Sequence, residues 1–438
     1  MSFDSFGLAQ PLLRAISTAG YTTPTPIQAE AIPHVLARRD VLGCAQTGTG
    51  KTAAFALPIL HHLTHNGNPA RGSGRRIRAL VLSPTRELAS QIRDSFQTYG
   101  AHTSLRCSVI YGGVGQHPQV KALRHGVDVV VATPGRLLDL MNQGHVDLRS
   151  VEIFVLDEAD RMLDMGFLPD LRRVIAKLPA ARQTVFFSAT MPAPIEQLAD
   201  AILRDPVRIR VAAVKATTEL IEQTVCFVPK PKKTDLLTTM LSKEEVTRAI
   251  VFTRTKHGAD RVVWQLNKAG IKAEAIHGNK SQAARQRSLA NFKSNRPPVL
   301  VATDLAARGI DVDGVSHVFN YDLPNEAETY VHRIGRTGRA GATGIAVSFC
   351  DHDERSYLRD IERLIRRPLT VDKEHAALAP LLGGARPKQA GNKSNQRSGQ
   401  SRPPRGHGGR HQRFDKQARP AKGGRGSRGR RQRSAAAV

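Results

Sequence analysis

The sequence has 438 residues, 65 of them Lys or Arg and 38 Asp or Glu, which gives a formal net charge of +27. No apolar run approaches the ~20 residues that a membrane-spanning helix requires, which excludes an integral membrane protein. The start MSFDSFGLAQ lacks a basic segment followed by an apolar one, and the four cysteines lie far apart. We therefore expect a cytoplasmic protein without a signal peptide or a disulfide framework. A strongly basic protein in that compartment favours nucleic acid as its partner.

The charge is concentrated at the C-terminal end. Residues 383–438 hold 16 Lys or Arg against Asp415 as the single acidic residue, so more than half of the surplus lies in an eighth of the chain. This segment is rich in Gly and has one aromatic residue, Phe414. Because it has too little apolar surface to offset the entropy of ordering, we predict a disordered basic tail.

Before the tail, short runs rich in Val, Ile and Leu alternate with longer segments of helical period. In the first half these runs are Val41–Ala45, Ala79–Leu82, Cys107–Tyr111, Val127–Ala132, Ile153–Leu156 and Val185–Phe187. In the second half they are Gln223–Phe227, Ala249–Phe252, Ala273–Ile276, Val299–Val301, His317–Asn320 and Gly344–Phe349. Such alternation predicts β-α-β units with buried parallel sheets. Two sets of six runs predict two α/β domains in tandem.

A small, polar stretch near Arg208–Ala216 separates the two sets of runs. The predicted division of the chain is residues 1–208 for the first domain, 209–216 for a linker, 217–367 for the second domain, 368–382 for a connecting segment and 383–438 for the tail. In open α/β sheets, ligands bind beyond the carboxyl ends of the strands. Residues of reactive type follow nearly all of the predicted strands.

A phosphate-binding loop is predicted directly after the first strand. The segment AQTGTGKT has the Walker A pattern with Ala in place of the first Gly, and it comprises Ala45, Gln46, Thr47, Gly48, Thr49, Gly50, Lys51 and Thr52. Gly48 and Gly50 allow the backbone to fold around phosphates, Lys51 can reach the β- and γ-phosphates, and the Thr52 hydroxyl can ligate Mg²⁺. The alternative is a glycine-rich turn that caps a helix and binds nothing.

An acidic cluster, DEAD, follows the predicted strand Ile153–Leu156. An acidic pair at a strand end beside a phosphate loop meets the needs of a Walker B site. Asp157 would hold Mg²⁺, and Glu158 would orient or deprotonate the attacking water. Taken alone, such a cluster is most often a helix N-cap with a favourable dipole.

With these two motifs the chain resembles a DEAD-box RNA helicase of superfamily 2. The likeness covers residues 1 to about 367 and rests on segments in the family's order: Gly20–Gln28, Pro84–Ala89, Gly112–Gly113, Thr133–Arg136, Asp157–Asp160, Ser188–Thr190, Val251–Thr255, His277–Asn279, Gln282 with Arg285, Ala302–Asp311 and His332–Arg339. The resemblance implies two RecA-like domains, ATP as substrate and RNA as partner. The segments VFTRTKHGAD and AIHGNKSQ, with the basic tail, look similar to the bacterial RhlE-type subgroup.

The resemblance also assigns roles at the nucleotide. Phe3, Tyr21 and Gln28 would contact adenine, and a Gln amide can present a donor and an acceptor to its N6 and N7. Gly309 and Asp311 would contact the nucleotide, the latter at the ribose. Arg336 and Arg339 would be arginine fingers, worth roughly 10³–10⁵ in rate. A loop of solvated arginines is the alternative for this run. Residues that couple hydrolysis to RNA would be Ser188, Thr190, Asp160 and His332.

The same resemblance implies a track for the sugar-phosphate backbone of one RNA strand. Its members are hydroxyls, bare backbone and guanidinium groups, which position a strand without reading bases. They are Pro84, Thr85, Arg86, Gly113, Thr133, Gly135, Arg136, Thr253, Arg254, Gly278 and Thr303. Any of them alone fits a turn or cap residue.

We therefore expect an ATP- and Mg²⁺-dependent RNA helicase that unwinds short duplexes locally. The Arg- and Gly-rich tail would bind RNA without choosing a sequence. Two rival functions remain: an RNA chaperone or annealing scaffold driven by the tail, and a DNA-directed translocase of superfamily 2. Ribosomal precursors and RNA-decay proteins are candidate partners, and we expect a monomer.

Overall fold

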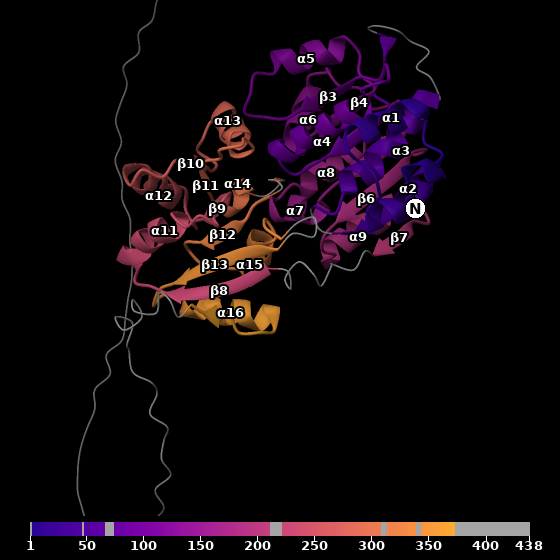
Figure 1. The fold of residues 1–438 in the computed structure, drawn as a ribbon. Coiled ribbons are helices and arrows are strands. Elements are labelled where there is room, and N and C mark those ends of the chain that lie inside the picture. The colour runs from indigo at the N-terminus through magenta and orange to yellow at the C-terminus, as the bar shows by residue number, and fades with distance from the viewer. Residues whose placement is uncertain are drawn as a thin grey trace, which may run out of the picture. The chain divides into compact units, whose positions relative to one another are not determined.

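The computed structural model describes residues 2–45, 48–65, 74–210, 221–307, 312, 314–338 and 343–372 (Figure 1). Most of the predicted linker, most of the connecting segment and the whole predicted tail lie outside these residues. Within the described ranges, no helix is both long and apolar enough to cross a membrane. We call residues 2–210 the first lobe and residues 221–372 the second lobe.

The first lobe is built on a sheet of seven parallel strands in the order β3-β4-β2-β5-β6-β1-β7. The strands are β1 Val41–Cys44, β2 Ala79–Leu82, β3 Cys107–Ile110, β4 Val129–Ala132, β5 Ile153–Leu156, β6 Gln183–Ser188 and β7 Val207–Arg210. All six predicted strands are present. The seventh, β7, was not predicted; it is a short edge strand, and its last two residues lie in the range predicted as linker.

Helices cover both faces of this sheet. They are α1 Gln10–Thr18, α2 Pro26–Leu36, α3 Lys51–His65, α4 Arg86–Tyr99, α5 His117–Arg124, α6 Pro134–Asn142, α7 Ala159–Asp164, α8 Leu168–Ile175 and α9 Ala193–Ile202, with a 3-10 helix at Phe3–Phe6. Alternate strand residues point to opposite faces. Accordingly Val155 packs with α1 to α4 in one core, while the neighbouring Phe154 packs with α5 to α9 in the other.

The second lobe is also a sheet of seven parallel strands, in the order β10-β11-β9-β12-β13-β8-β14. The strands are β8 Ile221–Phe227, β9 Ala249–Phe252, β10 Ala273–Ile276, β11 Val299–Ala302, β12 His317–Asn320, β13 Gly344–Cys350 and β14 Thr370–Val371. Its helices are α11 Lys233–Leu241, α12 Lys256–Lys268, α13 Gln282–Phe292, α14 Asp304–Ala307, α15 Ala327–Ile334 and α16 Arg355–Ile365, with a 3-10 helix at Lys230–Lys232. Only β14 was not predicted. Two parallel sheets of this kind confirm the predicted tandem RecA-like fold.

The strand order decides which loops can form a site together. Because every strand of the first sheet is parallel, all its carboxyl ends lie at one edge. The strands β5, β6 and β1 are neighbours in this order, and so are β3, β4 and β2. The predicted phosphate loop and acidic cluster follow β1 and β5 of the first group, and the predicted RNA residues of the first lobe follow the second group.

Candidate functional site

The phosphate loop leaves the sheet at the end of β1. The Ala45 amide donates to the Ser188 carbonyl at 3.1 Å, which continues the pairing of β1 with β6. Gly48 and Gly50 have backbone φ values of +85° and +92°, a conformation that residues other than glycine rarely adopt. Helix α3 then begins at Lys51, with Thr52 in its first turn. The two glycines therefore allow the sharp turn that an anion-binding loop requires.

Gln28, on α2, fastens this loop to the rest of the lobe. Its Nε2 donates to the Gly50 carbonyl at 3.1 Å, and its Oε1 accepts from the Thr25 amide at 3.0 Å. Thr25 Oγ1 donates to the Thr49 carbonyl at 2.8 Å. A Cβ at Gly50 would collide with Gln28 Nε2, so only glycine fits there. Each end of the amide makes one hydrogen bond within the protein, which leaves one N–H and one lone pair for the predicted adenine contact.

Phe3 and Tyr21 meet in an aromatic cluster beside α4. Their ring centroids lie 6.3 Å apart edge to face, and Phe3 is buried in the core. The Tyr21 hydroxyl lies 2.8 Å from that of Tyr99, whose pKa is raised by burial and by this hydrogen bond. The two predicted adenine neighbours are therefore brought together. Gln46 and Thr47 lie outside the described residues.

Lys51 and Asp157 form the centre of the site. Lys51 Nζ donates to the Ala45 carbonyl at 2.9 Å and lies 3.9 Å from Asp157 Oδ1. Both side chains are buried, and Asp157 Oδ1 has no hydrogen-bond partner among the described residues. Burial, together with the charge of Glu158, raises the pKa of Asp157 to about 6, although Lys51 opposes the shift.

This oxygen gives a direct test of whether a magnesium ion fits. A buried carboxylate oxygen without a partner normally needs an explanation such as an ion or a water. Mg²⁺ is usually bound through one or two carboxylates, waters and substrate phosphates rather than by a full protein cage. Among the described residues, no group of three or more His, Cys, Asp and Glu could hold a metal ion. The donor set around Asp157 therefore fits Mg²⁺ that arrives with a nucleotide.

Glu158 is held by a residue that the sequence analysis did not single out. Its backbone has φ +56°, a strained value for a non-glycine residue, at the N-cap of α7. Arg161 Nη1 donates to Glu158 Oε2 at 2.6 Å, and both side chains are buried. The only sequence pattern that could have indicated this pair is an Arg three residues after a Glu at a helix start. That pattern is common on helix surfaces, so it does not single out a site. Arg161 therefore fixes the direction of the candidate base.

The predicted coupling residues of the first lobe form one hydrogen-bond network. Asp160 Oδ2 accepts from the Thr190 amide and from its hydroxyl, both at 2.9 Å. Ser188 Oγ donates to the Thr190 carbonyl at 2.7 Å and lies 3.2 Å from the Asp160 amide, which donates to it. The segment after β6 is thus tied through Asp160 to the acidic cluster after β5, two residues after Glu158.

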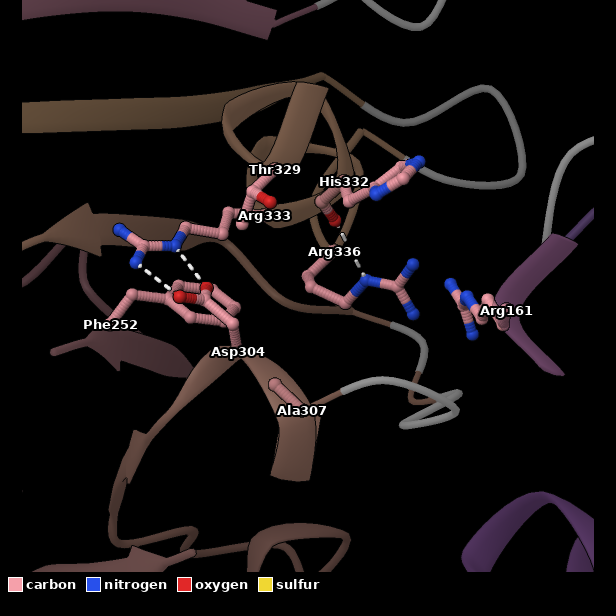
Figure 2. Close-up of a pocket in the computed structure, with 8 residues that line it drawn as sticks. All are labelled: Arg161, Phe252, Asp304, Ala307, Thr329, His332, Arg333 and Arg336. Carbon is pink, nitrogen blue, oxygen red and sulfur yellow. Dashed lines mark hydrogen bonds and ion pairs between the residues drawn. The ribbon is translucent and has the colours of Figure 1, made fainter. Parts of the chain in front are cut away.

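In the second lobe, α15 and the turn that follows it carry arginines with two different surroundings, which Figure 2 shows. Arg333 is 1% exposed and donates to both carboxylate oxygens of Asp304, at 2.5 and 2.8 Å. Arg336 Nε donates to the His332 carbonyl at 3.2 Å, and its guanidinium points into a pocket that Arg161 also lines. Arg333 is therefore a structural cation, while Arg336 faces the pocket. Arg339, Gly309 and Asp311 lie outside the described residues.

The predicted RNA residues of the first lobe follow β2, β3 and β4, with Pro84, Thr133 and Gly135 in the loops and first turns there. Thr85 Oγ1 caps α4 by accepting from the Leu88 amide at 3.2 Å. The Arg86 guanidinium lies against Gly113, where a Cβ would collide with it. Arg136 donates to the Val114 carbonyl at 3.4 Å.

Helix α13 of the second lobe contacts the same region. Arg86 Nη1 donates to Gln282 Oε1 at 3.3 Å, and Gln282 Nε2 donates to Glu87 Oε1 at 2.8 Å. Arg285 pairs with the other oxygen of Glu87 at 3.0 Å. In this arrangement Arg86 is partly engaged by protein, so contact with a phosphate would compete with Gln282.

The remaining predicted RNA residues follow β9, β10 and β11, which are neighbours in the second sheet. Thr253 is buried, and its hydroxyl donates to the Thr255 carbonyl at 3.2 Å. Arg254 is bound by the Glu354 carboxylate and lies 5.4 Å from the ring centroid of Tyr357. Gly278 has open space around its Cα, and the Thr303 amide donates to the Ile276 carbonyl. The Arg254 side chain is 31% exposed, so it keeps donors for the predicted RNA contact while Nη2 is bound to Glu354.

Comparison with known proteins adds to this geometry. Residues 25–198 match the DEAD/DEAH box helicase family, and residues 232–341 match the helicase conserved C-terminal domain. The chain is 44% identical to DEAD-box ATP-dependent RNA helicase CshA of Bacillus subtilis over 85% of this chain and 74% of that relative. It is 44% identical to DEAD-box ATP-dependent RNA helicase 30 of Arabidopsis thaliana over 83% of this chain, but spans only 62% of that relative. The solved structure of S. cerevisiae Dbp5 bound to RNA and ADP BeF3 has a TM-score of 0.75, with 33% identity over 87% of this chain and all of that one.

Proposed function

Because the chain belongs to the DEAD-box family of ATP-dependent RNA helicases, which hydrolyse ATP, we propose that hydrolysis takes place at the carboxyl edge of the first sheet. The observation that carries this proposal is the buried Asp157 oxygen, which has no hydrogen-bond partner among the described residues and only a long ion pair of 3.9 Å with Lys51, at the end of a glycine-rich loop. A buried charge is costly unless it is paired. The site is therefore arranged for a ligand that brings its own positive ion and its own phosphates.

The site residues of the first lobe would then have separate roles in the reaction. Lys51 and the loop amides bind the β- and γ-phosphates. Glu158, directed by Arg161, orients the attacking water and accepts its proton as the bond from the γ-phosphorus to the ADP oxygen breaks. A magnesium ion held by Asp157 and Thr52 would supply neutralisation of the phosphate charge.

The second lobe supplies Arg336 to the same reaction. A guanidinium stabilises the charge on the transferring phosphoryl group, and its loss costs roughly 10³–10⁵ in rate in related systems. Arg339 would act with it. Hydrolysis would then require both lobes to engage one nucleotide. The network of Asp160, Ser188 and Thr190, with His332, would link this step to the RNA track, and closure on one strand would separate short duplexes.

We also propose the finer assignments that the sequence favours. RNA would be bound without sequence preference, because the residues of the track are suited to sugar and phosphate rather than base edges. A cytoplasmic monomer that acts on ribosomal precursors or with RNA-decay proteins fits the composition. The RhlE-type subgroup stays a prediction; the bacterial relative described above carries the name CshA.

ATPase stimulation by RNA and DNA strands of equal length tests the proposal. We expect the full chain to hydrolyse ATP faster with single-stranded RNA, and Glu158→Gln to abolish multiple-turnover hydrolysis and strand separation. Stronger stimulation by DNA would favour a DNA translocase. Unchanged hydrolysis and strand separation in the Glu158→Gln protein would exclude the assigned base. Deleting residues 383–438 should leave the stimulation of ATP hydrolysis by RNA in place and weaken RNA affinity. An RNA chaperone driven by the tail would instead lose its annealing activity with the tail.

A further inference from the structure

One aromatic side chain of the second lobe is unusually exposed. Trp264, on α12, is 63% exposed, whereas the other exposed large apolar residues in the described part of the chain range from 38% to 44%. It is also the only tryptophan in the sequence. The opposite face of α12 is buried through Ala259, Val262 and Leu266, so the helix direction is fixed and the indole faces outward. The exposed ring therefore does not contribute to the core.

Basic side chains lie on the same face of α12 as Trp264. His257, Arg261 and Lys268 lie three, four or seven residues from it, the spacing that places side chains on one face. Lys268 Nζ lies 5.3 Å from the ring centroid, a cation–π distance. Among the described residues, neither Arg261 nor Lys268 makes an ion pair. The face is aromatic and positively charged.

The one acidic residue on this face is already neutralised. Asp260 accepts from His277 at 3.0 Å and from Lys280 at 2.9 Å. Asn267, the remaining polar neighbour, bonds to the Val263 and Ala273 carbonyls. No free carboxylate among the described residues of α12 therefore offsets Arg261 and Lys268, and the face is complementary to an anionic partner.

The position of the helix indicates which anion. Helix α12 begins directly after Thr253 and Arg254, two residues of the expected RNA track. Trp264 lies eight residues after Lys256, about 12 Å along the helix axis. A strand that leaves the track along α12 would meet the indole with one of its bases, and its phosphates would meet the cations.

We propose that Trp264, with Arg261 and Lys268, is a stacking platform for a base of single-stranded RNA, outside the track used in hydrolysis. Every base has a π-face, so stacking on an aromatic side chain tolerates any sequence. The cations contribute phosphate contacts without reading bases. RNA is favoured over a protein partner because the face combines one flat, exposed ring with two cations that make no ion pair among the described residues. The platform would hold RNA in the absence of nucleotide, when the lobes need not close.

The intrinsic fluorescence of the full chain tests the proposal directly. With one tryptophan, the signal reports on this face whatever else on the chain binds RNA. Without nucleotide, we expect adenosine or uridine 12-mers of RNA to quench Trp264 in a saturating manner, and an abasic 12-mer to leave it unquenched. RNA binding seen by the anisotropy of a labelled strand, with unchanged tryptophan fluorescence, would overturn the platform while leaving the helicase assignment intact. That outcome would instead leave the face to a protein partner.

Substitutions give an independent readout. Trp264→Ala should raise the RNA concentration for half-maximal ATPase stimulation at least about fivefold, the lower end of what a stacked base contributes. Trp264→Phe, which keeps a ring, should restore most of that affinity. Leu364→Ala, at another exposed apolar residue among basic neighbours, is the matched control and should change nothing. Equal effects of Trp264→Ala and Leu364→Ala would overturn the proposal.

The cations can be tested by salt dependence. If Arg261 and Lys268 each meet a phosphate, Arg261→Gln with Lys268→Gln should make the slope of log affinity against log salt less steep by about 1.4, from about 0.7 for each contact with a single strand. The slope is measured on the quenching of Trp264 in both proteins, and contacts that the two proteins share, those of the tail included, cancel in the difference. An unchanged slope would contradict the assignment of the two cations.

Discussion

The two lobes share one sheet topology, but the buried charges at the carboxyl edges of the two sheets have different surroundings. Both sheets have the same strand order when strands are matched by position, so β1 corresponds to β8 and β5 to β12. A lysine begins the helix after β1 and another begins the helix after β8, namely Lys51 and Lys233. An aspartate follows each matching strand, Asp157 and Asp322. The Lys–Asp distance is 3.9 Å in both lobes.

The surroundings of the two lysines differ. Lys51 follows a loop with two glycines at positive φ, and the neighbouring Asp157 keeps an oxygen without a partner. Lys233 follows Lys230–Lys232, a 3-10 helix with Pro229 at its N-cap, and its Nζ contacts Glu354 at 2.5 Å and Asp351 at 3.3 Å. Proline fixes φ near −65°, so this loop cannot wrap around a phosphate as a glycine loop does.

The two lobes differ in whether their buried charges have partners within the protein. In the second lobe, Glu354 accepts from Lys233, from Arg254 and from the Leu323 and Asp351 amides, so the charges are satisfied internally. In the first lobe, by contrast, Asp157 keeps an oxygen without a hydrogen-bond partner among the described residues. A buried polar network that is satisfied stabilises a structure, and one that is not satisfied is ready for a ligand. We therefore assign the nucleotide to the first lobe and a structural role to the second cluster.

The largest expected effect follows from removing the lysine of the second lobe. Lys233→Met would leave Asp351 buried without its cation and Glu354 with Arg254 alone, and burial already raises the pKa of Glu354 against the influence of Lys233. We expect the second lobe to lose about 3–5 kcal/mol of unfolding free energy, measured by urea denaturation. Lys232→Met removes an exposed neighbour and should cost no more than about 1 kcal/mol. Equal losses for the two proteins would contradict the structural role of Lys233.

The corresponding change in the first lobe should affect activity rather than folding. Lys51→Ala removes a phosphate contact, and we expect RNA-stimulated turnover to fall about 10²–10³-fold, as for loss of one preorganised donor to a transition state. The melting temperature without nucleotide should fall less than in Lys233→Met, because Asp157, whose pKa is already raised, can take up a proton when Lys51 is removed. Lys230→Ala, in the matching loop of the second lobe, is the control and should leave turnover unchanged. Strong destabilisation by Lys51→Ala with turnover per folded molecule intact would break the distinction between the lobes.

A smaller effect concerns the charge of Asp157. Because its pKa is raised from 3.8 to about 6, the native state binds an extra proton between these values. Its ionisation therefore costs stability that is still present below about pH 4 and is lost as the pH rises through 6. Asp157→Asn should stabilise the nucleotide-free chain by about 1–2 kcal/mol at pH 8, in EDTA, with less gain at pH 5. A larger gain at pH 5 than at pH 8 would contradict this sign.

Most of the fold could be predicted from the sequence, because buried parallel strands are continuous apolar runs. The two missed strands are edge strands: β7 alternates exposed arginines with apolar residues, and both residues of β14 are exposed. Their pairing depends on a neighbour that is distant in the sequence. The apolar alternation of β7 is only four residues long, and the two residues of β14 are too few to show any period.

The candidate site was predictable to a similar depth. Lys51, Asp157 and Glu158 follow strands in a recognisable order, so their meeting could be inferred. The partners of polar side chains could not, because they depend on tertiary packing. The Arg161–Glu158 pair joins residues close in the sequence, whereas the Arg254–Glu354 pair spans about a hundred residues. The bond from Gln28 to the Gly50 carbonyl is likewise a tertiary contact that the sequence did not indicate, and the predicted adenine contact stays a prediction.

The central claim is that the first lobe binds the nucleotide and the second lobe supplies Arg336 to its hydrolysis. Single-turnover hydrolysis by Arg336→Gln, at saturating RNA and ATP, tests this claim most directly. We predict a fall in rate of about 10³-fold or more, with ATP affinity little changed and the melting temperature close to that of the parent chain. A rate within about threefold of the parent would show that the first lobe hydrolyses ATP without the second lobe's arginine, which contradicts the claim.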